Sequence, residues 1–184
     1  MTTMKSLMEI IKARKSVRAY KDTALPQDIV DAILETGMNA PTARNLQQLE
    51  YKVITNTDLI SKLSDGIAKA MQNMPNMPAP PPGAPQRPSF FYGAPLLVII
   101  TAPKDNHFAV ADGALAVQNM MLYATSLDLG SCYIGLANFL NNVPEALQEI
   151  NIAENMNIVA TVICGYSAED PEPKEKKLNA EYFK

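Results

Sequence analysis

Apolar residues recur at helical intervals along five stretches of this chain, with polar residues between them. The spacing predicts a first helix that begins after Ser6 and ends near Lys15, and a second that follows Pro26 and closes near Gly37. Further helices are predicted over 58–71, 109–127 and 144–150. Helices therefore make up much of the predicted secondary structure.

Three shorter apolar stretches have the pattern of strands. Residues 51–55 alternate and are β-branched, whereas 95–101 and 158–164 are continuous apolar runs typical of strands buried on both faces. Half of the 14 prolines fall within residues 74–88, where regular structure should stop. The segment at about 72–92 is therefore predicted to be either an exposed loop or a lid over a substrate.

The predicted helix over 109–127 is rich in alanine and carries few charges after Asp112. A helix that is apolar around most of its circumference has to be buried, either centrally or against a second subunit. Because one modest domain supplies limited burial, this helix favours a homodimer.

Length and composition fit a single domain, residues 1–184, that can bury roughly 70% of its unfolded surface. The net charge of −3 argues against nucleic-acid binding, which usually needs a basic surface. Cys132 and Cys164 lie far apart and form no CxxC pair, which fits a reducing compartment. The N-terminus lacks a signal-peptide pattern, and no apolar run approaches the roughly 20 residues of a membrane span. We therefore expect a cytoplasmic protein with no membrane partner.

The segment 13–20 concentrates positive charge. Arg14, Lys15 and Arg18 offer donors suited to a phosphate or to an electron-rich ring edge. In a helix Arg14 and Arg18 would share one face, whereas in an extended chain Ser16 would join them. The extended form is favoured because Ser-Val is a poor helix interior. The alternative is a solvated basic end of the first helix, where cations suit the helix dipole.

A second segment, 40–48, is rich in amide side chains. Thr42, Asn45 and Gln47 offer the neutral donors and acceptors that a heterocyclic imide needs. The two segments are separated by one helix-length stretch. Together they have the chemistry of a flavin mononucleotide site, with the phosphate on the cationic half and the ring on the amide half.

Motifs of several other enzyme classes are missing. No G-x-G-x-x-G follows a strand, so a Rossmann dinucleotide site is not supported. The single histidine, His107, excludes a Cys/His zinc cluster and a His-centred triad, and no metal site is predicted. Asp112 is a lone carboxylate without an obvious partner, which argues against a paired-carboxylate hydrolase. We therefore expect the chemistry to come from a cofactor rather than from a catalytic side chain.

With these motifs in view, the sequence resembles the nitroreductase family of FMN-dependent oxidoreductases over essentially its whole length. The family's Arg-Arg-Ser-Ile-Arg-like stretch is matched by residues 14–18, and its Ala-Pro-Ser-Ala-x-Asn-x-Gln-Pro-Trp stretch by residues 40–49. A third match covers residues 112–119 and 127–135. The order of the three motifs is specific, whereas any one of them alone would be weak.

The resemblance implies a role for each matched residue. The FMN phosphate would contact Arg14, Lys15 and Ser16, and Arg18 would reach the ring near N1 and O2. The second motif would meet the flavin through Pro41, Thr42, Asn45 and Gln47. Backbone groups of Tyr133, Ile134 and Gly135 would approach the ring. In the tail, Lys174 and Lys176 resemble a Lys-x-Arg pair that completes the phosphate site, whereas Gln48 and Leu49 depart from the family's Pro-Trp.

The resemblance also implies an α+β fold with a central mixed, mostly antiparallel sheet flanked by helices, and a homodimer with flavins at the subunit interface. It implies a ping-pong cycle in which NAD(P)H reduces FMN at N5 and leaves before a nitro-aromatic or quinone-like acceptor enters. Two alternatives stay open. One is a flavin enzyme with other chemistry, such as reductive dehalogenation or flavin destruction, with 74–88 as its lid. The other is a flavin-binding module without turnover.

Overall fold

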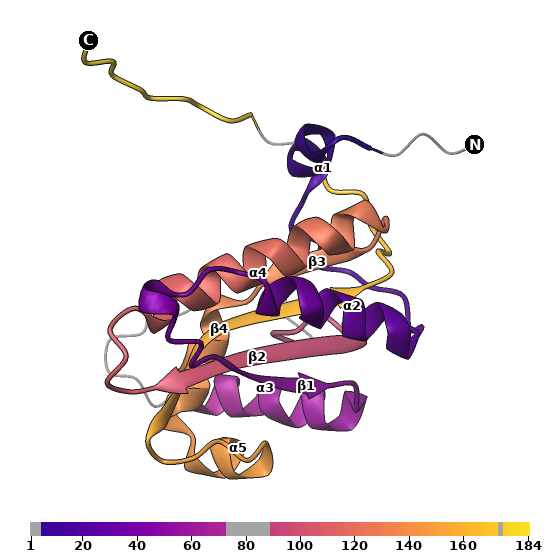
Figure 1. Ribbon diagram of the computed structural model, residues 1–184. Helices are drawn as coiled ribbons and strands as arrows, with labels where there is room; N and C mark the ends of the chain where they lie inside the picture. The colour runs from indigo at the N-terminus through magenta and orange to yellow at the C-terminus, as the bar shows by residue number, and fades with distance from the viewer. Residues whose placement is uncertain (1–4, 73–88, 173–174) are drawn as a thin grey trace.

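The computed structural model describes residues 5–72, 89–172 and 175–184. These residues form a four-stranded sheet in the order β1-β2-β4-β3 (Figure 1). The strands are β1 (Glu50–Ile54), β2 (Leu96–Pro103), β3 (Gly130–Tyr133) and β4 (Met156–Gly165). Each ladder between named strands is antiparallel, and a parallel bridge joins Ser16 to Ser131. The predicted mixed, mostly antiparallel sheet is therefore confirmed.

Each helix predicted from the hydrophobic spacing is present in the described residues. They are α1 (Leu7–Ala13), α2 (Gln27–Met38), α3 (Thr57–Gln72), α4 (Ala109–Ser126) and α5 (Pro144–Glu149). The predicted cap is also confirmed, because Ser6 and Glu9 form a reciprocal capping box at the start of α1. Pro26 precedes the first turn of α2, where its missing N–H costs nothing.

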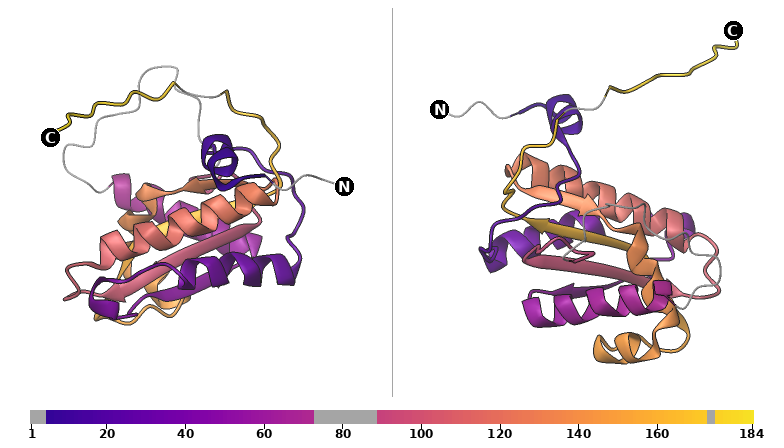
Figure 2. Two further views of the ribbon diagram at one scale, coloured as in Figure 1. Left: turned by 45° about the horizontal axis from the view of Figure 1, so that its top comes forward. Right: turned by 180° about the vertical axis from the view of Figure 1, so that it is seen from behind.

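The helices cover the sheet in two layers (Figure 1, Figure 2). α2 and α4 pack on one face, and α3 and α5 lie beyond the other together with the 3-10 segment η2 (Gly135–Asn142). Seven of the eight residues of β2 are buried, as expected for a strand covered on both faces. Gly37 lets α2 approach α4 closely, because a Cβ there would lie 2.2 Å from Cε of Met120.

Most of the loop or lid predicted at about 72–92 falls on residues 73–88, which lie outside the described residues. α3 continues to Gln72, and the chain resumes in a turn before β2. Phe91 in that turn is fully buried among residues of the α3 layer. The end of the predicted segment is therefore anchored in the core.

The outer side of α4 is apolar. Val110 is 62% and Leu115 46% exposed, and Leu7, Met8 and Ile11 of α1 are exposed as well. The C-terminal residues 175–184 extend away from the body near α1 (Figure 1, Figure 2). They include the exposed side chains of Leu178, Tyr182 and Phe183. Among the helices that the structure describes, none has the length and apolar character to cross a membrane.

Candidate functional site

The cationic segment leaves the helix before its charged residues begin. α1 ends at Ala13, and Arg14 has the extended torsion ψ of 122°. Val17 is buried, and its N–H donates to the carbonyl of Ser131 over 3.0 Å. Gly130 makes this approach possible, because a Cβ there would lie 2.9 Å from the Val17 side chain. The extended form favoured by the sequence is therefore confirmed, with Val17 as its buried anchor.

A cavity of about 540 Å³ opens beside this segment. Its lining brings together Arg14, Lys15, Ser16 and Arg18, as the sequence predicted, and adds Lys176 from the tail. The same cavity is lined by Lys12, Gln118 and Glu172, so five cations face it against one carboxylate. Lys174, the other predicted tail residue, lies outside the described residues. We call this the cationic cavity.

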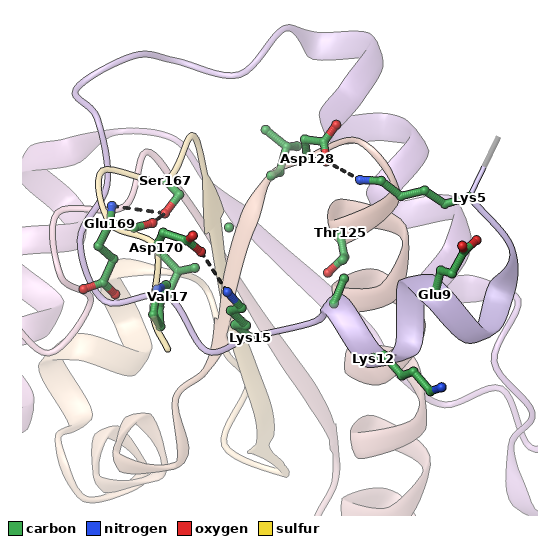
Figure 3. A pocket seen from close by; sticks show the side chains of 14 residues that line it. Lys5, Glu9, Lys12, Lys15, Val17, Thr125, Asp128, Ser167, Glu169 and Asp170 are labelled. Carbon is green, nitrogen blue, oxygen red and sulfur yellow. Dashed lines mark hydrogen bonds and ion pairs between the residues drawn. The ribbon is translucent and has the colours of Figure 1, made fainter. Parts of the chain in front are cut away.

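The chain that follows β4 runs back along the cationic segment. Backbone hydrogen bonds join Lys21 to Tyr166 and Ala168 to Ala19, each at 2.9 Å. This path places the Asp170 carboxylate 2.8 Å from Nζ of Lys15 (Figure 3). Asp170 is 92% exposed, so the pair contributes little to stability but occupies the Lys15 ammonium.

Figure 3 shows the adjoining cavity of about 580 Å³, in which this pair lies. It is enclosed by α1, the end of α4 and residues 167–171. A second ion pair, between Lys5 and Asp128, lies on its opposite side (Figure 3). Lys15 lines both cavities, so its ammonium lies where Asp170 and a bound anion would compete for it.

The amide segment is an irregular turn with hydrogen bonds between its own side chains and backbone. Its 3-10 turn η1 (Ala43–Asn45) and the following residues place Arg44, Asn45 and Gln47 in the left-handed region, with φ of 55°, 55° and 52°. The Thr42 hydroxyl accepts the Gln47 N–H over 3.1 Å. Left-handed backbone is unfavourable for arginine and glutamine, so other contacts have to hold the turn in place.

A cavity of about 290 Å³ is lined by the four predicted residues Pro41, Thr42, Asn45 and Gln47. Gln47 Nε2 donates to Asn45 Oδ1 over 2.7 Å. This bond leaves the Asn45 amide nitrogen as a donor and the Gln47 amide oxygen as an acceptor. The pair therefore presents the donor and acceptor that match the adjacent C=O and N–H groups of an imide. We call this the amide cavity.

Asp112 has a partner that sequence reasoning missed. It lies in the first turn of α4, is only 4% exposed, and accepts the Ala43 N–H over 3.0 Å. The two residues are 69 positions apart, so no local pattern could join them. The only local signal was a carboxylate in an otherwise apolar helix.

The third motif forms the end of β3 and the start of η2. Tyr133 pairs with Val162, and Ile134 is buried with its N–H donated to Thr161 over 2.9 Å. Gly135 is exposed. Among the described residues that line the two cavities, none comes from 133–135, so the predicted role of these residues stays a prediction.

Cys132, in β3 behind the cationic segment, is a buried thiol. Burial raises its pKa, and the positive charges of Arg18 and Arg14 oppose that rise. A thiol that stays protonated is a poor nucleophile. Cys132 is therefore not a candidate nucleophile for this site.

The cationic and amide cavities share no lining residue on one chain. Both lie along α4: Gln118 lines the cationic cavity, whereas Asp112 holds Ala43 of the amide segment. These two α4 residues are six positions apart, which is roughly 9 Å along the helix at 1.5 Å per residue. The structure thus gathers two chemically distinct sets of predicted residues and keeps them apart.

The model of the nitroreductase family matches residues 11–166. The chain belongs to the nitroreductase family. A nitroreductase from Bacteroides fragilis NCTC 9343, crystallised with bound FMN, is 32% identical, with 98% of each chain covered and a TM-score of 0.85.

Two further nitroreductase-family comparisons agree. A 4-nitrobenzoate reductase from Nocardioides sp. (strain LMS-CY) is 25% identical, over 85% of this chain and 78% of that protein. A nitroreductase from Desulfitobacterium hafniense DCB-2 shares the fold, with a TM-score of 0.87 at 20% identity over 99% of this chain and 100% of the other. The fold expected from the sequence resemblance is therefore confirmed.

Proposed function

We propose that this nitroreductase-family chain is an FMN-dependent oxidoreductase that passes electrons from NAD(P)H to nitro-aromatic or quinone-like acceptors. One observation carries the proposal: the same fold holds a cationic cavity and two amide side chains, Asn45 and Gln47, whose free donor and acceptor match an imide. Relatives support it, because one is named a 4-nitrobenzoate reductase and another was crystallised with FMN.

The cationic cavity has the chemistry that a phosphomonoester needs. The guanidinium group of Arg14 can donate paired hydrogen bonds to phosphate oxygens, and the Ser16 hydroxyl adds a neutral donor. Lys15 and Lys176, which also line the cavity, add point charges. The excess of cations over carboxylates fits a dianionic group, so the residues present fit the phosphate of FMN.

The amide cavity fits the other end of the cofactor. The pyrimidine edge of the flavin ring carries C=O and N–H groups side by side, and Asn45 and Gln47 offer the matching donor and acceptor. Both side chains are exposed, so a ring can reach them. Arg18, at the rim of the cationic cavity, would stabilise negative charge that develops on the ring.

When bound, FMN would supply the redox chemistry by taking a hydride at N5 and passing electrons to the acceptor. The chain would supply binding and electrostatics. Arg14, Lys15 and Ser16 hold the phosphate, and the amide pair fixes the ring edge. No side chain has to donate or remove a proton.

The separation of the two cavities supports a homodimer with the flavin at the subunit interface. On one chain they lie at different points along α4, so two copies can bring a cationic cavity to the partner's amide segment. The outer apolar side of α4, with Val110 and Leu115, offers the surface that such a pairing would bury. Sedimentation of Leu115→Glu tests this point: a shift to monomer with loss of flavin is expected, whereas an unchanged species would refute it.

The absorbance spectrum of the purified protein, followed by anaerobic titration with NADH and with NADPH, tests the function. We expect a flavin spectrum that one or both nucleotides bleach, and recovery on adding a nitro-aromatic acceptor. A protein that stays colourless after incubation with FMN would refute the proposal. A bound flavin that no nucleotide bleaches would favour a flavin-binding module.

A further inference from the structure

The start of α4 touches the amide segment at three points. The Asp112 carboxylate accepts the Ala43 N–H over 3.0 Å. The Arg44 guanidinium lies 5.7 Å from the centre of the Phe108 ring, within cation–π range. Asn106 Nδ2 donates to Gln48 Oε1 over 3.2 Å. The amide segment is therefore tied to the start of α4 and to the loop that leads into it.

Three residues at or before the start of α4 make these contacts, and Asp112 is the buried one. Its carboxylate is 4% exposed, and a buried charge is tolerated only where hydrogen bonds satisfy it. Its own backbone N–H is used inside the helix, where it donates to Phe108. The carboxylate points out of the helix toward the neighbouring segment, where it accepts the hydrogen bond from Ala43.

The position of this carboxylate is fixed by the sheet. Gly113 packs directly against β4, because a Cβ there would lie 3.1 Å from side-chain atoms of both Ala160 and Val159. α4 is therefore tightly packed on the sheet at this point. Asp112, the preceding residue, holds Ala43 from a rigid support.

The segment it holds needs that support. Arg44 and Gln47 adopt left-handed torsions that their side chains disfavour, and Ala43 immediately precedes them in the turn. Released from Ala43 onward, the turn would relax toward ordinary torsions. Relaxation would redirect Asn45 and Gln47 and break the 2.7 Å bond that sets which amide end faces outward.

We propose that Asp112 is a positioning residue for the imide-binding amide pair. Its carboxylate clamps Ala43 and so keeps Asn45 and Gln47 aimed at the ring of the cofactor. This inference rests on the proposed function, because it assigns the pair a flavin ring as its ligand.

The first test measures the hydrogen bond between the Asp112 carboxylate and the Ala43 N–H, and it needs no cofactor. Backbone amide hydrogen exchange is followed in the full-length protein before FMN is added, for wild type, Asp112→Leu and Asp112→Asn. Leucine removes the acceptor and keeps the branched shape of the side chain, so exchange at Ala43 and Gln47 should accelerate by about tenfold or more. Asparagine keeps an acceptor oxygen, so Asp112→Asn should stay within about threefold of wild type. Unchanged exchange in Asp112→Leu would overturn the proposal.

The second test asks whether the Asp112–Ala43 hydrogen bond affects binding of the flavin ring without affecting binding of the phosphate. Asp112→Leu should weaken FMN binding by about tenfold, whereas the affinity for inorganic phosphate should not change. Asn141→Leu is the matched control, because it also removes a side chain that bonds the backbone, at Ile158 in the other half of the core. The control should leave the FMN affinity within about twofold.

A second variant covers the case in which Asp112→Leu fails to fold. Ala43→Pro removes the donated N–H from the other side, and Thr42 before it is already extended, which suits a following proline. It should reproduce the loss of FMN affinity. If FMN binds wild type and both variants equally, the positioning role is overturned. If wild type binds phosphate but no FMN, the proposed function fails first, and the exchange rates show separately whether the clamp exists.

Discussion

Replacing Asp170 by asparagine should tighten the binding of FMN. In the structure the Asp170 carboxylate lies 2.8 Å from Nζ of Lys15, and Lys15 also lines the cationic cavity. A phosphate that enters the cavity has to take Lys15 away from this carboxylate. Removing the negative charge therefore removes a competitor.

The size of the effect follows from the exposure of the pair. Lys15 is 26% and Asp170 92% exposed, so solvent screens the interaction heavily. Exposed pairs contribute about 0.2–1 kcal/mol, which corresponds to a gain in affinity of up to about fivefold. The gain should shrink as salt is raised from 50 mM to 500 mM, because salt screens exposed charges.

Quenching of flavin fluorescence during titration of the apoprotein measures this affinity. Asp128→Asn is the matched control, because Asp128 forms an exposed pair with Lys5 across the adjoining cavity. The control should change the affinity by less than about 1.5-fold at 150 mM salt. A weaker affinity in Asp170→Asn, or an equal gain in both variants, would show that Lys15 does not meet the phosphate.

Three further predictions concern the site and its support. Arg18→Ala should weaken FMN binding by about tenfold or more and lower the flavin reduction potential, while Arg18→Lys should keep part of the affinity and part of the potential. Unchanged affinity and potential in the alanine variant would remove Arg18 from the ring site. Gly130→Ala should lower the free energy of unfolding by about 1–3 kcal/mol in urea titrations, because its Cβ would meet Val17 at 2.9 Å, and an unchanged midpoint would contradict that contact. Burial raises the pKa of Cys164 to about 12, so the unfolded chain releases this proton first and stability should fall as the pH rises above about 9. Cys164→Ala should flatten that decline by up to about 1.4 kcal/mol per pH unit between pH 9 and 11. If the free energies of unfolding of wild type and variant fall in parallel with pH, the raised pKa of Cys164 is contradicted.

The parts of the fold that the sequence predicted are those with strong local patterns. The helix 109–127 and the buried strands 95–101 and 158–164 are long enough for their periodicity to be decisive. The extended form of 14–18 was also predictable, because Ser16 and Val17 are poor helix interior and the structure buries Val17. Local propensity and tertiary packing agree at these positions.

The strand β3 could not be predicted in the same way. It has only four residues, begins with glycine, and is stabilised by its pairing with β4. Its sequence was noticed instead as a glycine-containing match to the family. Short strands depend on the partner strand, which sequence periodicity does not report.

The contacts that build the site were missed for a related reason. The bond between Asp112 and Ala43 and the pair between Lys15 and Asp170 join residues 69 and 155 positions apart. The left-handed torsions at Arg44 and Gln47 oppose local preference, so the sequence did not predict them. The sequence supplied the residue types of the site, whereas the fold determines which of them meet.

A crystal structure of the protein grown with FMN tests the central claim most directly. The account predicts the phosphate within hydrogen-bond distance of Arg14, Lys15 and Ser16, and the pyrimidine edge of the ring on Asn45 and Gln47, with two copies of the chain around each flavin. A flavin bound elsewhere, with these side chains turned toward solvent, would contradict it.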